Sequence, residues 1–197
     1  KELPHQPDRF GNPAPGKRYP GIDEVIYDPA EVIVPGFLPD TPACRAELAQ
    51  YYQSISRIDQ GVGQLIQVLK EEGVWNETLM IYISDHGIAM PGAKTTLYEG
   101  GMRSPLLFRH PDGKGRGVVH RAMVSWVDLT PTILDFAGAL DAATGRVKQD
   151  VLDRIPPNRT RTDPQTTADT DRGDLHGRSF LPILDQSEAE GWDTVYA

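Results

Sequence analysis

Apolar residues recur every three or four positions between Thr41 and Gly73, which is the spacing of one face of a helix. Thr41 can cap the first turn and Pro42 suits its first position, while Gly73 can end the helix. We therefore predict one long amphipathic helix whose apolar stripe packs on a sheet. The stripe consists of Leu48, Tyr51, Ile55, Ile58, Val62, Leu65, Ile66 and Leu69.

The next apolar segment, Leu79 to Ile83, shows no alternation and is typical of a strand buried on both faces of a parallel sheet. We predict a further strand at Pro105 to Arg109 and β character again from Val118 to Trp126. The segment Asp128-Leu129-Thr130-Pro131 is expected to cap a short helix from Thr132 to Ala137. The order helix, strand, strand, strand, helix indicates an α/β fold with a mixed or parallel sheet.

Polar segments surround this pattern. Residues 1–40 are rich in proline and glycine and predict a loop-rich segment over a surface. Residues 41–140 hold the predicted helix, strands and connecting loop. Residues 141–174 form a polar insertion with few hydrophobic side chains, and residues 175–197 are expected to return to the same domain.

Composition narrows the classes of function. A chain of 197 residues that is 39% hydrophobic can bury one core. The net charge of -8 argues against nonspecific binding to nucleic acid, and the sequence shows neither a signal peptide nor an 18-residue apolar span. The single cysteine, Cys44, excludes an internal disulfide, and we place it in the first turn of the predicted helix.

Candidate chemistry gathers after the strand that ends at Ile83. Ligands of open α/β sheets bind outside the carboxyl ends of strands, where Ser84-Asp85-His86-Gly87 lies. Asp85 and His86 can share one ion if the chain turns there, and Gly87 permits the turn. The residues alone leave a second interpretation open, in which Asp85 caps a turn and His86 and Lys94 are exposed to solvent.

These residues carry a family resemblance. Ser-Asp-His-Gly, then Lys94 followed by Thr-Thr-Leu-Tyr-Glu-Gly-Gly-x-Arg-x-Pro, resembles the second signature of the type I sulfatases of the alkaline phosphatase superfamily. Residues 34–42, 56–63 and 127–134 resemble the heparan N-sulfatase (sulfamidase) branch in particular. The resemblance implies a sulfatase-like α/β sandwich with a mixed, mostly parallel sheet that is incomplete in this chain.

The resemblance also implies roles for single residues. Asp85 and His86 would be metal ligands, while Lys94 and His5, the latter within Pro-His-x-Pro, would contact the sulfate group. The implied cofactor is a divalent cation, Ca²⁺ by resemblance, although the imidazole of His86 better suits Mn²⁺ or Zn²⁺.

Two further charged residues of the signature are expected to have structural roles. We assign Glu99 and Arg103 to a buried ion pair or to hydrogen bonds with the glycine turn.

The nucleophile of the family is a formylglycine made from the first residue of a C/S-x-P-x-R motif. Cys44 is followed by Arg-Ala-Glu and does not fit, so we expect the motif upstream of this chain and no activity from the chain alone. The expected function of the parent is hydrolysis of sulfate esters or sulfamates on a sugar or glycosaminoglycan. Its substrate would be a sulfated small molecule or carbohydrate. A periplasmic, secreted or lysosome-like location is implied by resemblance only.

Two alternatives stay open. His86 favours a phosphonate or phosphate ester hydrolase of the same superfamily, and the missing nucleophile favours an inactive remnant with a binding or structural role. Exposed sheet edges are expected to make the chain prone to self-association, including a homo-oligomer.

Overall fold

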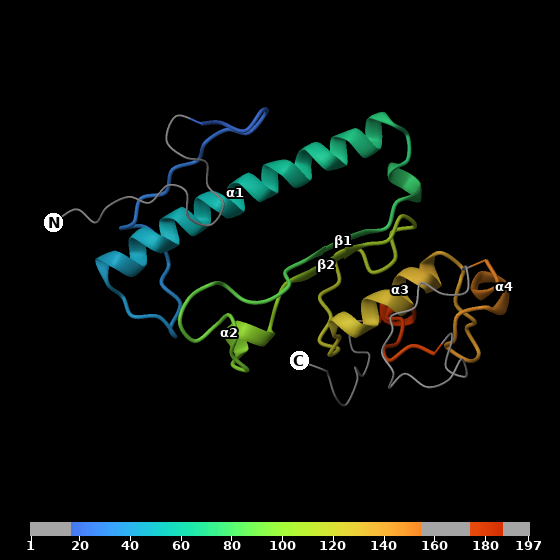
Figure 1. Ribbon diagram of the computed structural model, residues 1–197. Coiled ribbons are helices and arrows are strands. Elements are labelled where there is room, and N and C mark those ends of the chain that lie inside the picture. The colour runs from blue at the N-terminus through green and yellow to red at the C-terminus, as the bar shows by residue number, and fades with distance from the viewer. Residues whose placement is uncertain (1–16, 155–173, 187–197) are drawn as a thin grey trace. The chain divides into compact units, whose positions relative to one another are not determined.

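The computed structural model describes residues 17–154 and 174–186 of the chain (Figure 1). The described residues divide into two compact units, one holding the residues up to Thr78 with Tyr82–Leu107 and the other holding Leu79–Ile81 with those from Phe108 on. The elements in chain order are α1 (Pro42–Glu71), η2 (Trp75–Glu77), β1 (Met80–Ile83), α2 (Glu99–Met102), β2 (Leu106–Arg109), η3 (Trp126–Asp128), α3 (Leu129–Phe136), α4 (Gln149–Leu152) and η5 (Leu181–Ile183), where η marks a 3-10 helix.

The described residues contain one sheet, in which β1 pairs with β2 in antiparallel orientation. The two predicted strands are confirmed, but β1 is only partly buried and Ile83 is exposed, because the strand has a single neighbour among these residues. The strand expected between Val118 and Trp126 is wrong. Gly115 and Gly117, just before this segment, turn the backbone with positive φ. Among the described residues the segment forms no backbone ladder, and the side chain of His120 instead bonds through Nε2 to the carbonyl of Leu184 (2.7 Å).

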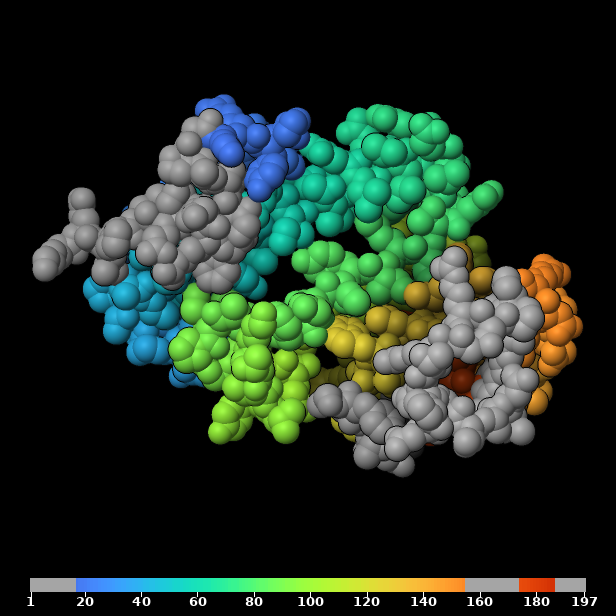
Figure 2. Space-filling view, in the orientation of Figure 1, coloured from blue at the N-terminus to red at the C-terminus, as the bar shows by residue number. Residues whose placement is uncertain are grey.

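The long helix is confirmed as α1, with the Thr41 hydroxyl accepting the amide of Cys44 at its start and Gly73 in the left-handed region after its end. The expected cover of its apolar stripe is not present among the described residues, since Ile55, Ile58 and Leu65 stay 40–52% exposed. Figure 2 shows the second half of α1, in blue-green, at the surface. Within the described part of the chain, none of the helices is long and apolar enough to cross a membrane.

The first half of α1 holds the core of its unit. Leu48 and Ala49 are buried with Val32 and Leu38 from the preceding loop. Burial, followed by the nearby phenols of Tyr82 and Tyr52, raises the pKa of Tyr51. Cys44 is a free thiol in the first turn that packs against this cluster, so its predicted structural role is confirmed.

The segment before α1 is held along the polar face of the helix. The amide of Gln64 donates to the carbonyl of Gly21 (2.6 Å), and Gln60 both accepts from the amide of Asp23 and donates to its carbonyl. Tyr27 and Ser56 share a hydrogen bond of 2.5 Å. Residues 17–41 contain neither helix nor strand. Side chains of Gln60 and Gln64 in α1 therefore supply hydrogen-bond partners for backbone groups of this segment.

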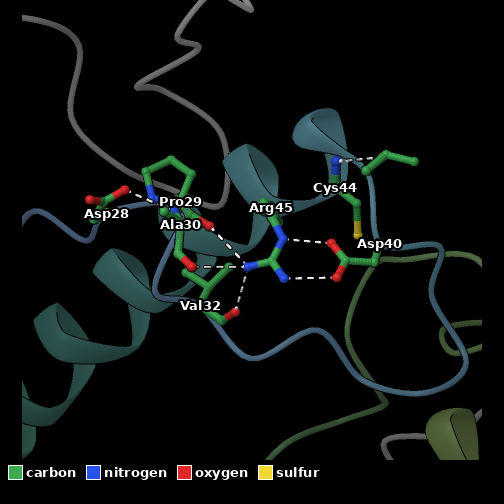
Figure 3. A network of polar contacts seen from close by, with 8 residues as sticks. Asp28, Pro29, Ala30, Val32, Asp40, Cys44 and Arg45 are labelled. Carbon is green, nitrogen blue, oxygen red and sulfur yellow. Dashed lines mark hydrogen bonds and ion pairs between the residues drawn. The ribbon is translucent and has the colours of Figure 1, made fainter.

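Arg45 organises the end of the same segment (Figure 3). Its Nε and one terminal nitrogen donate to the two oxygens of Asp40 at 2.5 and 2.8 Å, a bidentate pair. The other terminal nitrogen reaches the carbonyls of Pro29, Ala30 and Val32 at 3.4, 3.1 and 3.2 Å. The hydrogen bond from Arg45 holds the pKa of Asp40 below its ordinary value. One side chain thereby closes the loop that contributes Val32 and Leu38 to the core.

In the second unit, Asp128 joins two segments distant in sequence. Its carboxylate accepts the amides of Ser125 (2.8 Å) and Arg178 (2.9 Å), and it is 3% exposed. A residue with a Cβ at Gly177 would overlap the carbonyl oxygen of Val127, so only glycine allows this approach. The predicted helix begins earlier than expected, at Leu129, because η3 runs directly into α3.

Two further bonds hold the returning segment against α3. The Thr132 hydroxyl accepts the amide of Phe180 (3.1 Å), and the Ser179 hydroxyl donates to Asp135 (2.5 Å). In Figure 1 the red segment accordingly lies beside the yellow α3. The polar insertion has local structure at its start, where Leu140 bridges Val147 and α4 follows.

Candidate active site

The loop between β1 and β2 is closed by a contact between glycines. The amide of Gly87 donates to the carbonyl of Gly101 at 3.3 Å. A Cβ on Gly87 would overlap the carbonyl oxygen of Gly100, and one on Gly101 would overlap the carbonyl oxygens of Thr96 and Ala93. The two ends of the loop can therefore meet only because these positions carry no side chain.

Between its ends the loop folds on its own backbone. The amide of Lys94 donates to the carbonyl of Ile88 (3.1 Å), and Ala93, before it, is completely buried. Ile88 and Met90 pack against the hydrophobic cluster at the start of α1. Lys94 is therefore placed by a buried support beneath it, while its own side chain is exposed.

The residue after Lys94 is in a conformation that its type disfavours. Thr95 has φ of 66°, in the left-handed region, which β-branched residues rarely adopt. Its neighbour Thr96 donates its hydroxyl to the carbonyl of Ala93 (2.7 Å). Strain of this kind is found where the surrounding structure fixes the backbone, often at functional sites.

Asp85 and His86 lie next to each other at the end of β1. Oδ2 of Asp85 is 3.3 Å from Nε2 of His86, and Nδ1 of the ring is 2.9 Å from the carbonyl of Gly87. If Nδ1 carries the proton and donates it to this carbonyl, Nε2 turns a lone pair toward the carboxylate. Two acceptors at this distance need a proton or a cation between them.

This pair fits part of a metal site. Two ligands bound to one divalent cation lie roughly 3 Å apart, as Oδ2 and Nε2 do here. No group of three or more candidate ligands exists within residues 17–154 and 174–186, so the pair would need further donors from elsewhere. The turn that we expected to bring Asp85 and His86 together is present, and their role as ligands stays a prediction.

Glu99 at the start of α2 and Arg103, the residue after its end, form an ion pair of 3.5 Å, but both side chains are about 85% exposed. The expectation of a buried pair is therefore wrong. In this exposed setting the pair contributes little to stability. The glycine turn is instead held by backbone bonds, including that from Arg103 to the carbonyl of Glu99 (2.9 Å).

The remaining predicted site residue, His5, lies outside the described residues. Sequence reasoning missed the supports of the loop, Ile88 and Met90, because a lone apolar residue on either side of Ala89 has no periodicity to mark it. It also missed the strain at Thr95, which no sequence pattern signals.

Comparison with known proteins identifies the class to which this fold and loop belong. The sequence profile of the Sulfatase family matches residues 4–139, and the chain belongs to this family of hydrolases. It is 48% identical over 131 residues to human N-sulphoglucosamine sulphohydrolase, an alignment covering 66% of this chain and 26% of that protein. It is 36% identical over 102 residues to an arylsulfatase of Clostridium perfringens, covering 48% and 21% of the two chains.

A solved structure supports the fold. The phosphonate monoester hydrolase of Silicibacter pomeroyi matches with a TM-score of 0.51 and 24% identity, over 84% of this chain and 28% of that chain. This likeness supports the expected alkaline-phosphatase-like α/β fold. The chain spans about a quarter, or less, of the length of the curated relatives named above.

Proposed function

We propose that the complete protein is a sulfatase that hydrolyses sulfate esters or sulfamates on a sugar or glycosaminoglycan. The observation that carries the proposal is the loop after β1, where the glycine contact closes a turn bearing Asp85, His86 and Lys94 in the order of the family signature. The 48% identity to a relative named for a sulphoglucosamine substrate supports the sulfamidase-like branch.

In this proposal Asp85 and His86 hold a divalent cation, which the family generally uses. When bound, the cation supplies fixed positive charge near the sulfate oxygens, where negative charge develops during hydrolysis. The carbonyl of Gly87 orients the imidazole by accepting from Nδ1 (2.9 Å). Calcium is the ion that the family resemblance implies, while a nitrogen ligand at His86 suits Mn²⁺ or Zn²⁺.

Lys94 is proposed to bind the sulfate group directly. Its side chain is exposed and ends in an amino group, and its backbone is fixed by the bond to Ile88 and by buried Ala93. A cationic side chain at this position can stabilise the negative charge that develops on the sulfate oxygens in the transition state. His5 is proposed as a second donor to the same group.

Members of the family generally use a formylglycine as nucleophile. Cys44 does not supply it, because it packs against the core in the first turn of α1 and lacks the surrounding motif. We propose that the nucleophile, the remaining metal ligands and the other, mostly parallel strands of the sheet belong to a segment outside this sequence. A periplasmic, secreted or lysosome-like location and a homo-oligomeric state are part of the same proposal.

A second candidate is hydrolysis of phosphonate or phosphate esters, and the imidazole of His86 next to Asp85 favours it. The discriminating experiment uses the complete protein on an aryl sulfate, a glucosamine N-sulfate and an aryl phosphodiester, before and after metal removal. Turnover of the first or second substrate that returns with added metal supports a sulfatase. Preference for the phosphodiester supports the second candidate, and no turnover of any of them opposes both.

A further inference from the structure

The second unit has a cavity of about 420 Å³, and none of its lining residues belongs to the loop between β1 and β2 that holds Asp85. Its volume falls in the range of small-ligand pockets. The turn after β2, the end of α3 and the start of η5 build it, and the lining residues are His110, Asp112, Lys114, Asp135, Phe136, Leu181 and Pro182.

His110 is the buried polar group of this cavity, with 7% of its surface exposed. The amide of Asp112 donates to Nδ1 (3.2 Å), so the neutral ring carries its proton on Nε2. The edge-to-face contact with Phe136, at 5.4 Å between ring centres, fixes the plane of the imidazole. Nε2 makes no hydrogen bond within the described part of the chain. His110 lines the cavity, and Nε2 is the ring atom that is left to donate to a ligand.

Other lining groups add acceptors, a second donor and an apolar wall. Asp112 presents a largely exposed carboxylate, and Asp135 is fixed by the Ser179 hydroxyl (2.5 Å) at its Oδ2. Lys114 contributes an ammonium group, while Phe136 and Pro182 contribute apolar surface. The cavity thus has hydrogen-bond donors, acceptors and apolar surface among its lining residues.

This combination excludes some ligand classes. Two carboxylates oppose a small anion such as sulfate. A sugar hydroxyl both donates and accepts, and the C–H face of a pyranose is apolar, so a saccharide uses every kind of group present.

We propose that this cavity binds one neutral saccharide unit, with Asp112 and His110 bonding its hydroxyls and Phe136 covering its apolar face. The site goes beyond the proposed function, since it requires neither sulfate chemistry nor the metal pair. It would give the protein a second binding site for a carbohydrate.

The test uses the 197-residue chain and two unsulfated probes, methyl β-glucoside and chitotetraose, followed by saturation-transfer NMR and calorimetric titration. We expect a Kd on the order of 1 mM or below. Asp112→Asn removes a charged acceptor from an exposed side chain and should weaken binding by about tenfold. Phe136→Leu should weaken it as well. Asp150→Asn, a change of the same kind on α4, should leave the Kd unchanged.

Several results would overturn the proposal. One is the absence of saturation transfer from both probes to a chain whose circular dichroism shows that it is folded. Another is equal binding by Asp112→Asn and Asp150→Asn. A third is loss of binding in Lys94→Ala, which would place the saccharide at the Asp85 loop. If glucosamine 6-sulfate binds and neither neutral probe does, the proposal is wrong. Sulfatase activity of the complete protein is a separate measurement and does not affect these outcomes.

Discussion

Oδ2 of Asp85 lies 3.3 Å from Nε2 of His86, while the other ring nitrogen faces the carbonyl of Gly87. A cation between these two atoms would relieve the repulsion of two acceptors. In the complete protein we expect Asp85→Ala to lower metal affinity and turnover together, with excess metal restoring part of the loss. Metal titration with turnover as readout measures both. Normal metal binding by this variant would show that Asp85 is not a ligand.

Lys94 should behave differently from Asp85. Its proposed contact is with the sulfate, so Lys94→Ala should leave metal affinity nearly unchanged and lower turnover by about a hundredfold or more. The same titration decides this point. Rescue of Lys94→Ala by added metal would mean that the two roles have been assigned wrongly.

The glycine contact that closes the loop predicts that substitution of glycine by alanine has opposite effects on stability in the loop and in α1. Gly101→Ala would push a methyl group into the carbonyls of Thr96 and Ala93 and should destabilise the chain by about 2 kcal/mol or more. Gly63 lies within α1 with nothing near its missing side chain, so Gly63→Ala should stabilise it by up to about 1 kcal/mol. Urea unfolding compares the two, and equal midpoints would contradict the contact.

The pair formed by Arg45 and Asp40 predicts a pH dependence. Because the folded-state pKa of Asp40 lies below the ordinary 3.8, the unfolded chain takes up the proton first as the pH falls. The stabilisation is therefore fully present above pH of about 4 and is lost as pH falls through the folded-state pKa. A cycle of Asp40→Asn, Arg45→Gln and the double variant should show coupling at pH 7 that shrinks toward pH 2. Coupling independent of pH would contradict this.

Asp128 should control the attachment of the returning segment. Asp128→Ala leaves the amides of Ser125 and Arg178 without their buried acceptor and should cost about 3 kcal/mol. Hydrogen exchange at Arg178 and Phe180 should accelerate. Asp150→Ala, at an exposed position of α4, should change stability by less than about 0.5 kcal/mol. Unchanged exchange at Arg178 in Asp128→Ala would show that the segment is held by other contacts.

Sequence patterns located the elements that depend on local signals. Thr41, Pro42 and Gly73 predicted the ends of α1 because caps and turn residues act within a few positions. Gly87 likewise marked the turn after β1, where its amide donates to the carbonyl of Gly101.

Features that depend on distant partners could not be predicted in this way. Val118–Trp126 has strand-forming residues, but a strand also needs a neighbouring strand to pair with. Among the described residues, His120 of this segment instead forms a side-chain hydrogen bond with the carbonyl of Leu184. We expected a buried pair of Glu99 and Arg103 from their residue types. Whether these side chains are buried depends on which other segments pack against α2, and both are exposed among the described residues. No local sequence signal marks His110 as a buried residue, since its burial against Phe136 depends on a tertiary contact.

The backbone conformation of Thr95 affects which amino acids are favoured at this position of the loop. A β-branched residue at φ of 66° is more strained than glycine or asparagine would be. Substitution of Thr95 by either residue is therefore expected to stabilise the chain. A lineage that retains threonine here gives up that stability immediately beside Lys94. Selection for thermal robustness and selection for the local shape of the loop would thus act on this codon in opposite directions.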